Sequence, residues 1–153
     1  MTTVTQEKSD HAVVGTISPR LSLTREVVDN ILSTAFDGGM MSDWCDRCYS
    51  EGYDLDGYVR GHPEDDMAEY GYAAVARGGK LIIREVDWSD GFVASLIEAH
   101  SLDMAKLITG IEKYIALENM DIEELGRFFD SGMDAIDACN IIECAIFGEV
   151  RYC

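Results

Sequence analysis

Apolar residues recur every three or four positions in several stretches of the chain, which predicts amphipathic helices. The first predicted helix runs from Thr24, a suitable N-cap, to Phe36, and Gly38 and Gly39 end it. A second follows Ser101, the expected cap, and covers 102–118. Shorter helices are predicted over 42–51, 67–76 and 121–130. These elements would supply most of the apolar surface of the core.

The last predicted helix covers 137–148, with Asp137 as its cap and Gly148 as its stop. Residues 13–23 are β-branched and apolar, which favours a short edge strand or an extended arm. A strand is predicted over 80–86, and 92–100 would return as its partner after a turn at 87–91. The pattern therefore predicts an α+β fold, with helices packed around a small antiparallel β-sheet. Residues 1–20 are expected to form a flexible or extended N-terminal arm, and 21–153 a single domain.

Charge changes this picture more than any other property of the sequence. The chain has 29 acidic residues against 12 Lys and Arg, a formal net charge of −17. Such a chain is repelled by phosphate backbones and anionic membranes, so direct binding to nucleic acid or to a membrane is disfavoured. No apolar run reaches the length of a membrane span, and the first 15 residues lack the pattern of a signal peptide. We therefore expect a cytoplasmic protein.

Acidic residues concentrate in two segments of the chain. Residues 51–70 contain seven acids and one base, Arg60, and residues 118–149 contain nine acids and one base, Arg127. One interpretation is a pair of solvated faces that keep the protein soluble. The other is a negative surface that imitates the phosphates of a duplex and covers a basic groove on a partner. On this second interpretation the expected partner-binding residues are Asp54, Asp56, Glu64, Asp65, Asp66 and Glu69.

The five cysteines suggest only one local motif, the C-x-x-C formed by Cys45 and Cys48. In a reducing compartment structural disulfides are improbable, so most thiols should be small buried hydrophobic groups. The pair could instead be half of a zinc site, with His62 as third ligand and His11, His100 or an Asp as fourth. A redox role would require a βαβ setting that the pattern lacks. Zinc is thus the one cofactor that the sequence suggests, and inward packing on a helix is the alternative.

Sequence motifs typical of enzymes are lacking. The chain has no G-x-S-x-G motif of a serine hydrolase. The glycines at 78–79 are not accompanied by the other residues of a phosphate-binding loop. Residues 87–98 have the length of a calcium-binding loop, but they do not carry oxygen ligands and glycine at the positions that calcium requires. We therefore expect no enzymatic activity. A protein that sequesters a signalling nucleotide is an alternative function, for which the only nearby basic residues are Arg60, Arg77, Lys80 and Arg84.

Several segments together resemble a group of small acidic proteins encoded by phages and prophages of gut bacteria. The similar segments are LTREVVDNILSTAFDGG (23–39) followed by Trp44 and Cys45, ARGGKLIIRE (76–85), LITGIEKYI (107–115) and IDACNIIECAIFGEVRYC (136–153). Cys48 and the acidic stretch 51–66 depart from this pattern. The resemblance implies phage origin, and with it a location in the cytoplasm of a host cell, but it supplies no catalytic residues to transfer. Small acidic phage proteins are often inhibitors of host defence, including anti-CRISPR proteins, so the resulting hypothesis is an inhibitor of a bacterial defence nuclease.

Overall fold

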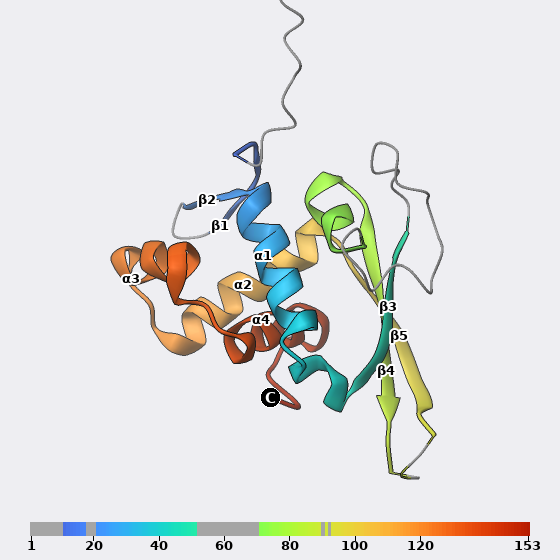
Figure 1. Cartoon of the computed structure of the whole chain (residues 1–153). Helices are drawn as coiled ribbons and strands as arrows, with labels where there is room; N and C mark the ends of the chain where they lie inside the picture. Colours follow the sequence, from blue (N-terminus) through green and yellow to red (C-terminus); the bar gives the residue numbers. More distant parts are fainter. Residues whose placement is uncertain (1–10, 18–20, 52–70, 90, 92) are drawn as a thin grey trace, which may run out of the picture.

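Four α-helices and two antiparallel sheets make up the part of the chain that the structure describes (Figure 1). The structure is a computed structural model, and it describes residues 11–17, 21–51, 71–89, 91 and 93–153. The predicted α+β class is confirmed. The expected division into an arm over 1–20 and a domain over 21–153 stays a prediction.

A two-stranded hairpin precedes the first helix. Strand β1 (Val13–Ile17) pairs with β2 (Leu21–Thr24), and Ile17 and Leu23 are buried. Helix α1 (Arg25–Asp37) begins where the sequence predicts, because the Thr24 side chain accepts a hydrogen bond from the backbone N–H of Val27. Its buried residues are Val28, Ile31, Leu32, Ala35 and Phe36.

The larger sheet has the strand order β3-β4-β5. Strand β3 (Cys45–Glu51) follows a short 3-10 helix, η1 (Met40–Asp43), so the predicted helix over 42–51 is wrong. The pairing of β3 with β4 (Lys80–Asp87) shifts register between Cys45 and Arg47, which makes Asp46 the extra residue of a β-bulge. Because the bulge adds one residue, Cys45 and Cys48 both face the core. A bulged strand can therefore bury residues three positions apart, as a helix does.

Strand β5 (Ser95–Leu102) completes the sheet and confirms the predicted return strand. The part of the β4–β5 hairpin nearest its turn extends beyond the helices (Figure 1), and Trp88, Val93, Leu96 and Ile97 are exposed there. A 3-10 helix, η2 (Gly71–Arg77), occupies the described part of the predicted helix over 67–76.

Helices α2 (Met104–Glu118), α3 (Ile122–Arg127) and α4 (Ala135–Phe147) follow the sheet in sequence. Asp103 caps α2 and Asp134 caps α4, so the predicted caps Ser101 and Asp137 are wrong by two and three residues. Gly148 ends α4 in the left-handed conformation, as predicted. A short π-helix, η3 (Phe128–Gly132), continues from α3.

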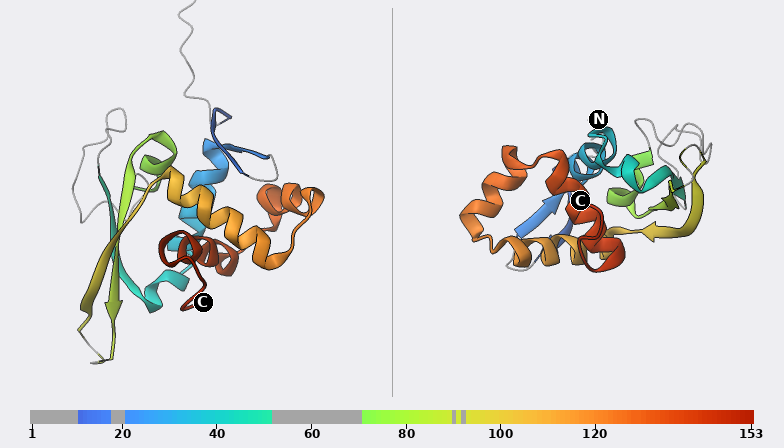
Figure 2. Two further views of the ribbon diagram at one scale, coloured as in Figure 1. Left: turned by 180° about the vertical axis from the view of Figure 1, so that it is seen from behind. Right: turned by 90° about the horizontal axis from the view of Figure 1, so that it is seen from below.

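One hydrophobic core joins the helices to the sheet. Helix α4 packs against both α1 and α2 (Figure 2), and Tyr152 after it hydrogen-bonds to Glu143 on α4 and to Glu85 on β4. Trp44, on the loop before β3, lies fully buried in this core. None of the helices in the described ranges is long and apolar enough to cross a membrane.

Candidate functional site

The predicted partner-binding acids Asp54, Asp56, Glu64, Asp65, Asp66 and Glu69 lie outside the described residues, and so does the predicted zinc ligand His62. Their roles therefore stay predictions. The other two predicted zinc ligands, Cys45 and Cys48, are buried in the hydrophobic core. Within the described ranges, neither belongs to a group of three side chains whose ligand atoms could share a metal ion. Their position favours the packing interpretation, and zinc binding with His62 stays a prediction.

Two of the four bases named for nucleotide binding, Arg77 and Arg84, already have carboxylate neighbours, and Arg60 lies outside the described residues. The Arg77 guanidinium lies 3.2 Å from Asp29, and that of Arg84 lies 3.3 Å from Asp46. A phosphate at either position would compete with an existing ion pair. The nucleotide alternative stays a prediction, which would have to rely on Arg60 and Lys80 or displace these two ion pairs.

The structure instead brings together two acids that the sequence pattern did not distinguish, Glu85 on β4 and Glu143 on α4. Glu85 is 3% exposed and Glu143 is fully buried. A buried carboxylate is costly unless hydrogen-bond donors surround it. In this protein most of those donors come from residues 149–153, which we call the clasp segment.

Glu143 binds the backbone of the clasp segment. Its carboxylate accepts hydrogen bonds from the backbone N–H groups of Arg151, at 3.2 Å, of Tyr152, and of Cys153, at 3.1 Å. Burial raises the pKa of Glu143, and the three N–H groups oppose that rise. One side chain thus accepts hydrogen bonds from three successive backbone N–H groups.

Glu85 binds side chains of the same segment. Its carboxylate accepts a hydrogen bond from the Tyr152 hydroxyl at 2.6 Å and lies 2.7 Å from Nε2 of His100. Burial alone would raise the pKa of Glu85, but these two partners, together with the Arg151 guanidinium 3.9 Å away, lower it below its ordinary value. The bond to Glu85 in turn raises the pKa of Tyr152.

Aromatic rings complete the attachment of the clasp segment. The Tyr152 ring stacks on Trp44 with centroids 5.5 Å apart, and the Phe147 ring meets Trp44 edge-on at 5.2 Å. The Arg151 guanidinium lies 4.2 Å above the Phe147 ring, within the range of a cation–π contact. The clasp segment is therefore held by charge, hydrogen bonds and ring stacking together.

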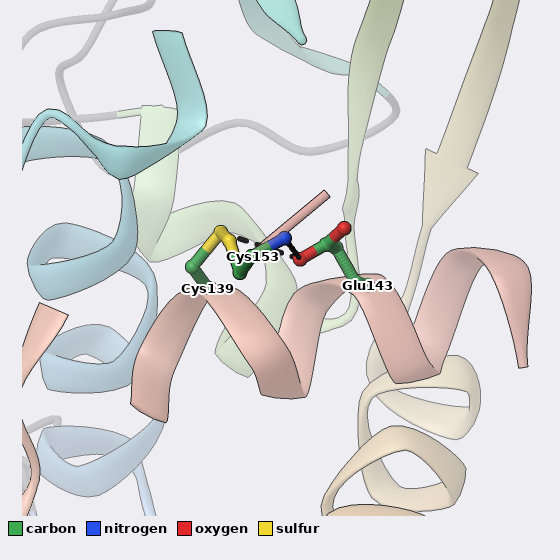
Figure 3. A group of neighbouring side chains, drawn as sticks. All are labelled: Cys139, Glu143 and Cys153. Atoms are coloured by element: carbon green, nitrogen blue, oxygen red, sulfur yellow. Dashed lines mark hydrogen bonds between the residues drawn. A yellow bond between two sulfur atoms is a disulfide. The ribbon is translucent and has the colours of Figure 1, made fainter. Parts of the chain in front are cut away.

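A disulfide joins Cys153, the last residue of the clasp segment, to Cys139 on α4 (Figure 3). This pairing contradicts the expectation that the cysteines form no structural disulfide. The pair is 14 residues apart, and its Cα atoms are 6.8 Å apart, within the usual range. The expectation rested on the assumed compartment, and the sequence carries no signal that selects this pair from five cysteines.

Two groups of side chains in the described ranges could hold a metal ion. One consists of Cys139, Glu143 and Cys153, and the other of Glu85, Glu98 and His100. In the second group Glu85 and His100 are already hydrogen-bonded to each other, so an ion would have to displace that bond. In the first group the two sulfurs are bonded to each other. The expected absence of enzymatic activity stays a prediction.

Six acids of the second acid-rich segment are exposed, in α3 and in the segments on either side of it. We call them the α3 acidic surface, and they are Glu118, Asp121, Glu123, Glu124, Asp130 and Asp134. Asp121 and Glu124 form the capping box of α3, and Asp134 caps α4. A surface hollow of about 340 Å³ is lined by Glu118, Met120, Glu124, Arg127, Phe128 and Gly132. Capping therefore explains half of these acids.

Comparisons of the chain with protein-family models, with curated proteins and with solved structures give no match. The resemblance to small acidic phage proteins stays a prediction.

The buried Glu85 leads to a prediction for pH. Glu85→Gln should lower the free energy of unfolding at neutral pH by about 1–3 kcal/mol, because the Tyr152 hydroxyl and His100 lose a charged, buried acceptor. Since the folded-state pKa of Glu85 is depressed, its stabilising effect is present above the ordinary value of 4.5 and is lost as pH falls through the folded-state value. Denaturant unfolding of both proteins from neutral pH to about pH 3.5 measures this difference.

The exposed Glu98→Gln serves as the control on the neighbouring strand, with an expected change within about 0.5 kcal/mol. The wild type and Glu85→Gln should differ less in free energy of unfolding at about pH 3.5 than at neutral pH. If the difference is the same at both pH values, the pKa of Glu85 is not depressed in the folded protein.

Proposed function

We propose that this protein is a non-catalytic binding protein that covers a basic, nucleic-acid-binding surface of another protein. The observation that carries the proposal is the α3 acidic surface, in a chain with a net charge of −17. A body with this charge is drawn to cationic surfaces and repelled by polynucleotides. The partner would therefore be a protein whose own ligand is DNA or RNA.

Three acids of the α3 acidic surface have no evident structural role. Glu118, Glu123 and Asp130 are exposed, and none of them is part of a helix cap or an ion pair among the residues that the structure describes. Carboxylates with no internal partner can meet an incoming arginine or lysine without breaking an existing interaction. Their positions suit the recognition of cations.

Exposed apolar residues accompany these acids. Leu117 at the end of α2, Ile122 at the start of α3 and Ile136 in the first turn of α4 are all at least 50% exposed. Protein interfaces combine an apolar centre with a polar rim, and this segment of the chain supplies both. A purely solubilising face would not need large apolar side chains beside its charges.

The resemblance to small acidic phage proteins favours a bacterial defence nuclease, such as a CRISPR effector, as the partner. Blocking the groove that holds nucleic acid would inhibit the nuclease without any chemistry in the inhibitor. The predicted acids at 54–69 would extend the contact.

The proposal predicts strongly salt-dependent competition with nucleic acid. The chain should displace a labelled duplex from a purified CRISPR effector, and its apparent Kd should rise at least about tenfold between low and high salt. Glu118→Gln with Glu123→Gln should raise the Kd roughly fivefold, mainly through slower association. Fluorescence anisotropy of the duplex follows the displacement directly.

The matched control is Asp43→Asn with Glu98→Gln, which removes the same charge from two exposed acids outside the α3 acidic surface. Its Kd should stay within about twofold of wild type. A separate variant that neutralises Asp54, Asp56, Glu64, Asp65, Asp66 and Glu69 tests the contribution of the other acid-rich segment. Binding that ignores salt, or tight binding of the chain itself to the duplex, would refute the proposal.

A further inference from the structure

The disulfide and the buried Glu143 together have the composition of a metal site. Cys139 and Glu143 lie four residues apart, so they occupy the same face of α4, and the clasp segment brings Cys153 beside them (Figure 3). One ligand atom from each of the three side chains lies within 4.8 Å of the others. This group is separate from Cys45, Cys48 and the α3 acidic surface.

One sulfur-to-oxygen distance in this group already matches tetrahedral zinc. Zinc–sulfur bonds of about 2.3 Å and zinc–oxygen bonds of about 2.1 Å place sulfur and oxygen about 3.6 Å apart. Cys139 Sγ lies 3.6 Å from Glu143 Oε2. Two thiolates on one zinc ion lie about 3.8 Å apart, so the sulfurs need only separate once their bond is broken.

Burial explains why an ion would be favoured in the reduced state. Two thiolates and a carboxylate would place three negative charges beside a buried face of α4. Burying that charge without a nearby cation would cost much free energy. A divalent cation neutralises most of that charge and replaces the thiol protons.

We propose that reduction of the Cys139–Cys153 disulfide creates a zinc site whose protein ligands are Cys139, Cys153 and Glu143. A dithiol reductant supplies two electrons and two protons, the S–S bond breaks, two thiols form, and the reductant closes its own disulfide. Zinc then binds both sulfurs, and the two thiol protons pass to solvent. Cys153 is exposed, so the reductant and the ion can reach the site.

A fourth position is open to water or to Met41. The Met41 Sδ lies 3.6 Å from Cys139 Sγ. A thioether beside two thiolates also suits monovalent copper, whereas the Glu143 carboxylate favours zinc. The clasp segment is covalently or coordinately attached to α4 in both states, so its position over Glu85 and Trp44 is retained when the disulfide is reduced.

The test uses the full chain, reduced with a dithiol and desalted without oxygen. Titration with zinc chloride against a chromophoric chelator should show that the reduced protein binds one equivalent more than the oxidised protein. Cys139→Ser and Cys153→Ser should each weaken zinc binding about 100-fold or more. Cobalt should give a thiolate-to-metal charge-transfer band in the reduced wild type and lose intensity in both variants.

Two controls separate this site from the alternatives. Cys144→Ser removes a buried thiol of the same helix that lies outside the group and should bind zinc as wild type does. Circular dichroism of the reduced variants, compared with the reduced wild type, shows whether each is folded. Failure of the reduced wild type to bind zinc would overturn the proposal. So would binding of monovalent copper alone, or zinc binding lost only in a Cys45→Ser, Cys48→Ser variant.

Discussion

Trp44→Ala is expected to lower the free energy of unfolding by about 3–5 kcal/mol, the range for removing a large buried aromatic side chain. Trp44 is fully buried where three parts of the chain meet. It precedes β3, its ring stacks on Tyr152 of the clasp segment, and it meets Phe147 at the end of α4. Alanine would leave a cavity bounded by elements that cannot all move inward, so little of the loss would be recovered.

Trp88→Ala is the matched control, because it makes the same change at a side chain that is 40% exposed near the β4–β5 turn. Its expected cost is below about 1 kcal/mol. Denaturant unfolding followed by circular dichroism measures both variants on one scale. Equal losses at the two positions would show that Trp44 does not join the sheet to α4.

Trp44→Phe adds an internal check on the same site. The indole Nε1 of Trp44 has no hydrogen-bond acceptor among the residues that the structure describes. Phenylalanine removes that unsatisfied donor while keeping much of the ring volume, so the loss should be only about 1–2 kcal/mol. A loss as large as that of alanine would mean that the indole N–H does have a partner.

Local signals in the sequence were sufficient to predict α1. Its cap, its apolar face and its stop all lie within 24–39, and no distant residue has to be known. The β4–β5 hairpin was predictable for the same reason, since both strands flank one short turn. Elements whose determinants are adjacent in the chain can be inferred from one sequence.

The predicted caps failed because several suitable residues lie close together. Ser101 can cap a helix in principle, but in this fold it is paired with Ile82 in the sheet, so the helix begins after Asp103. Asp137 is the third residue of α4, and its side chain accepts a hydrogen bond from the backbone N–H of Asp134. Only the end of the preceding element decides which candidate becomes the cap.

The candidate site was not predictable because it depends on contacts between distant residues. Tyr152 and Glu85 are 67 positions apart, and Glu143 has no feature in the sequence that separates it from 28 other acids. Five cysteines allow many pairings, and the C-x-x-C was the more conspicuous one. A bulge at Asp46 then gave β3 the apolar spacing of a helix, which led to the wrong element for Cys45 and Cys48.

The contact between α2 and α4 leads to the second large effect. Gly110 lies against Ala145, and a Cβ added at position 110 would come within 2.5 Å of the Ala145 Cβ and 2.7 Å of its backbone. Backbone atoms cannot rotate away, so the two helices would have to separate. Gly110→Ala should therefore lower the free energy of unfolding by about 2–3 kcal/mol, despite the better helix propensity of alanine.

Gly126→Ala makes the same substitution in α3, where no atom lies within 4 Å of the added Cβ. It should stabilise the protein by about 0.5–1 kcal/mol, so the two variants are expected to differ in sign. Combining Gly110→Ala with Ala145→Gly removes the colliding methyl group and should recover part of the loss. A double-mutant cycle measured by denaturant unfolding gives that coupling energy. If the losses in free energy of unfolding from Gly110→Ala and Ala145→Gly simply add, α2 and α4 do not pack through these two residues. The proposed zinc ligands on α4 would then lack the rigid support that this contact gives them.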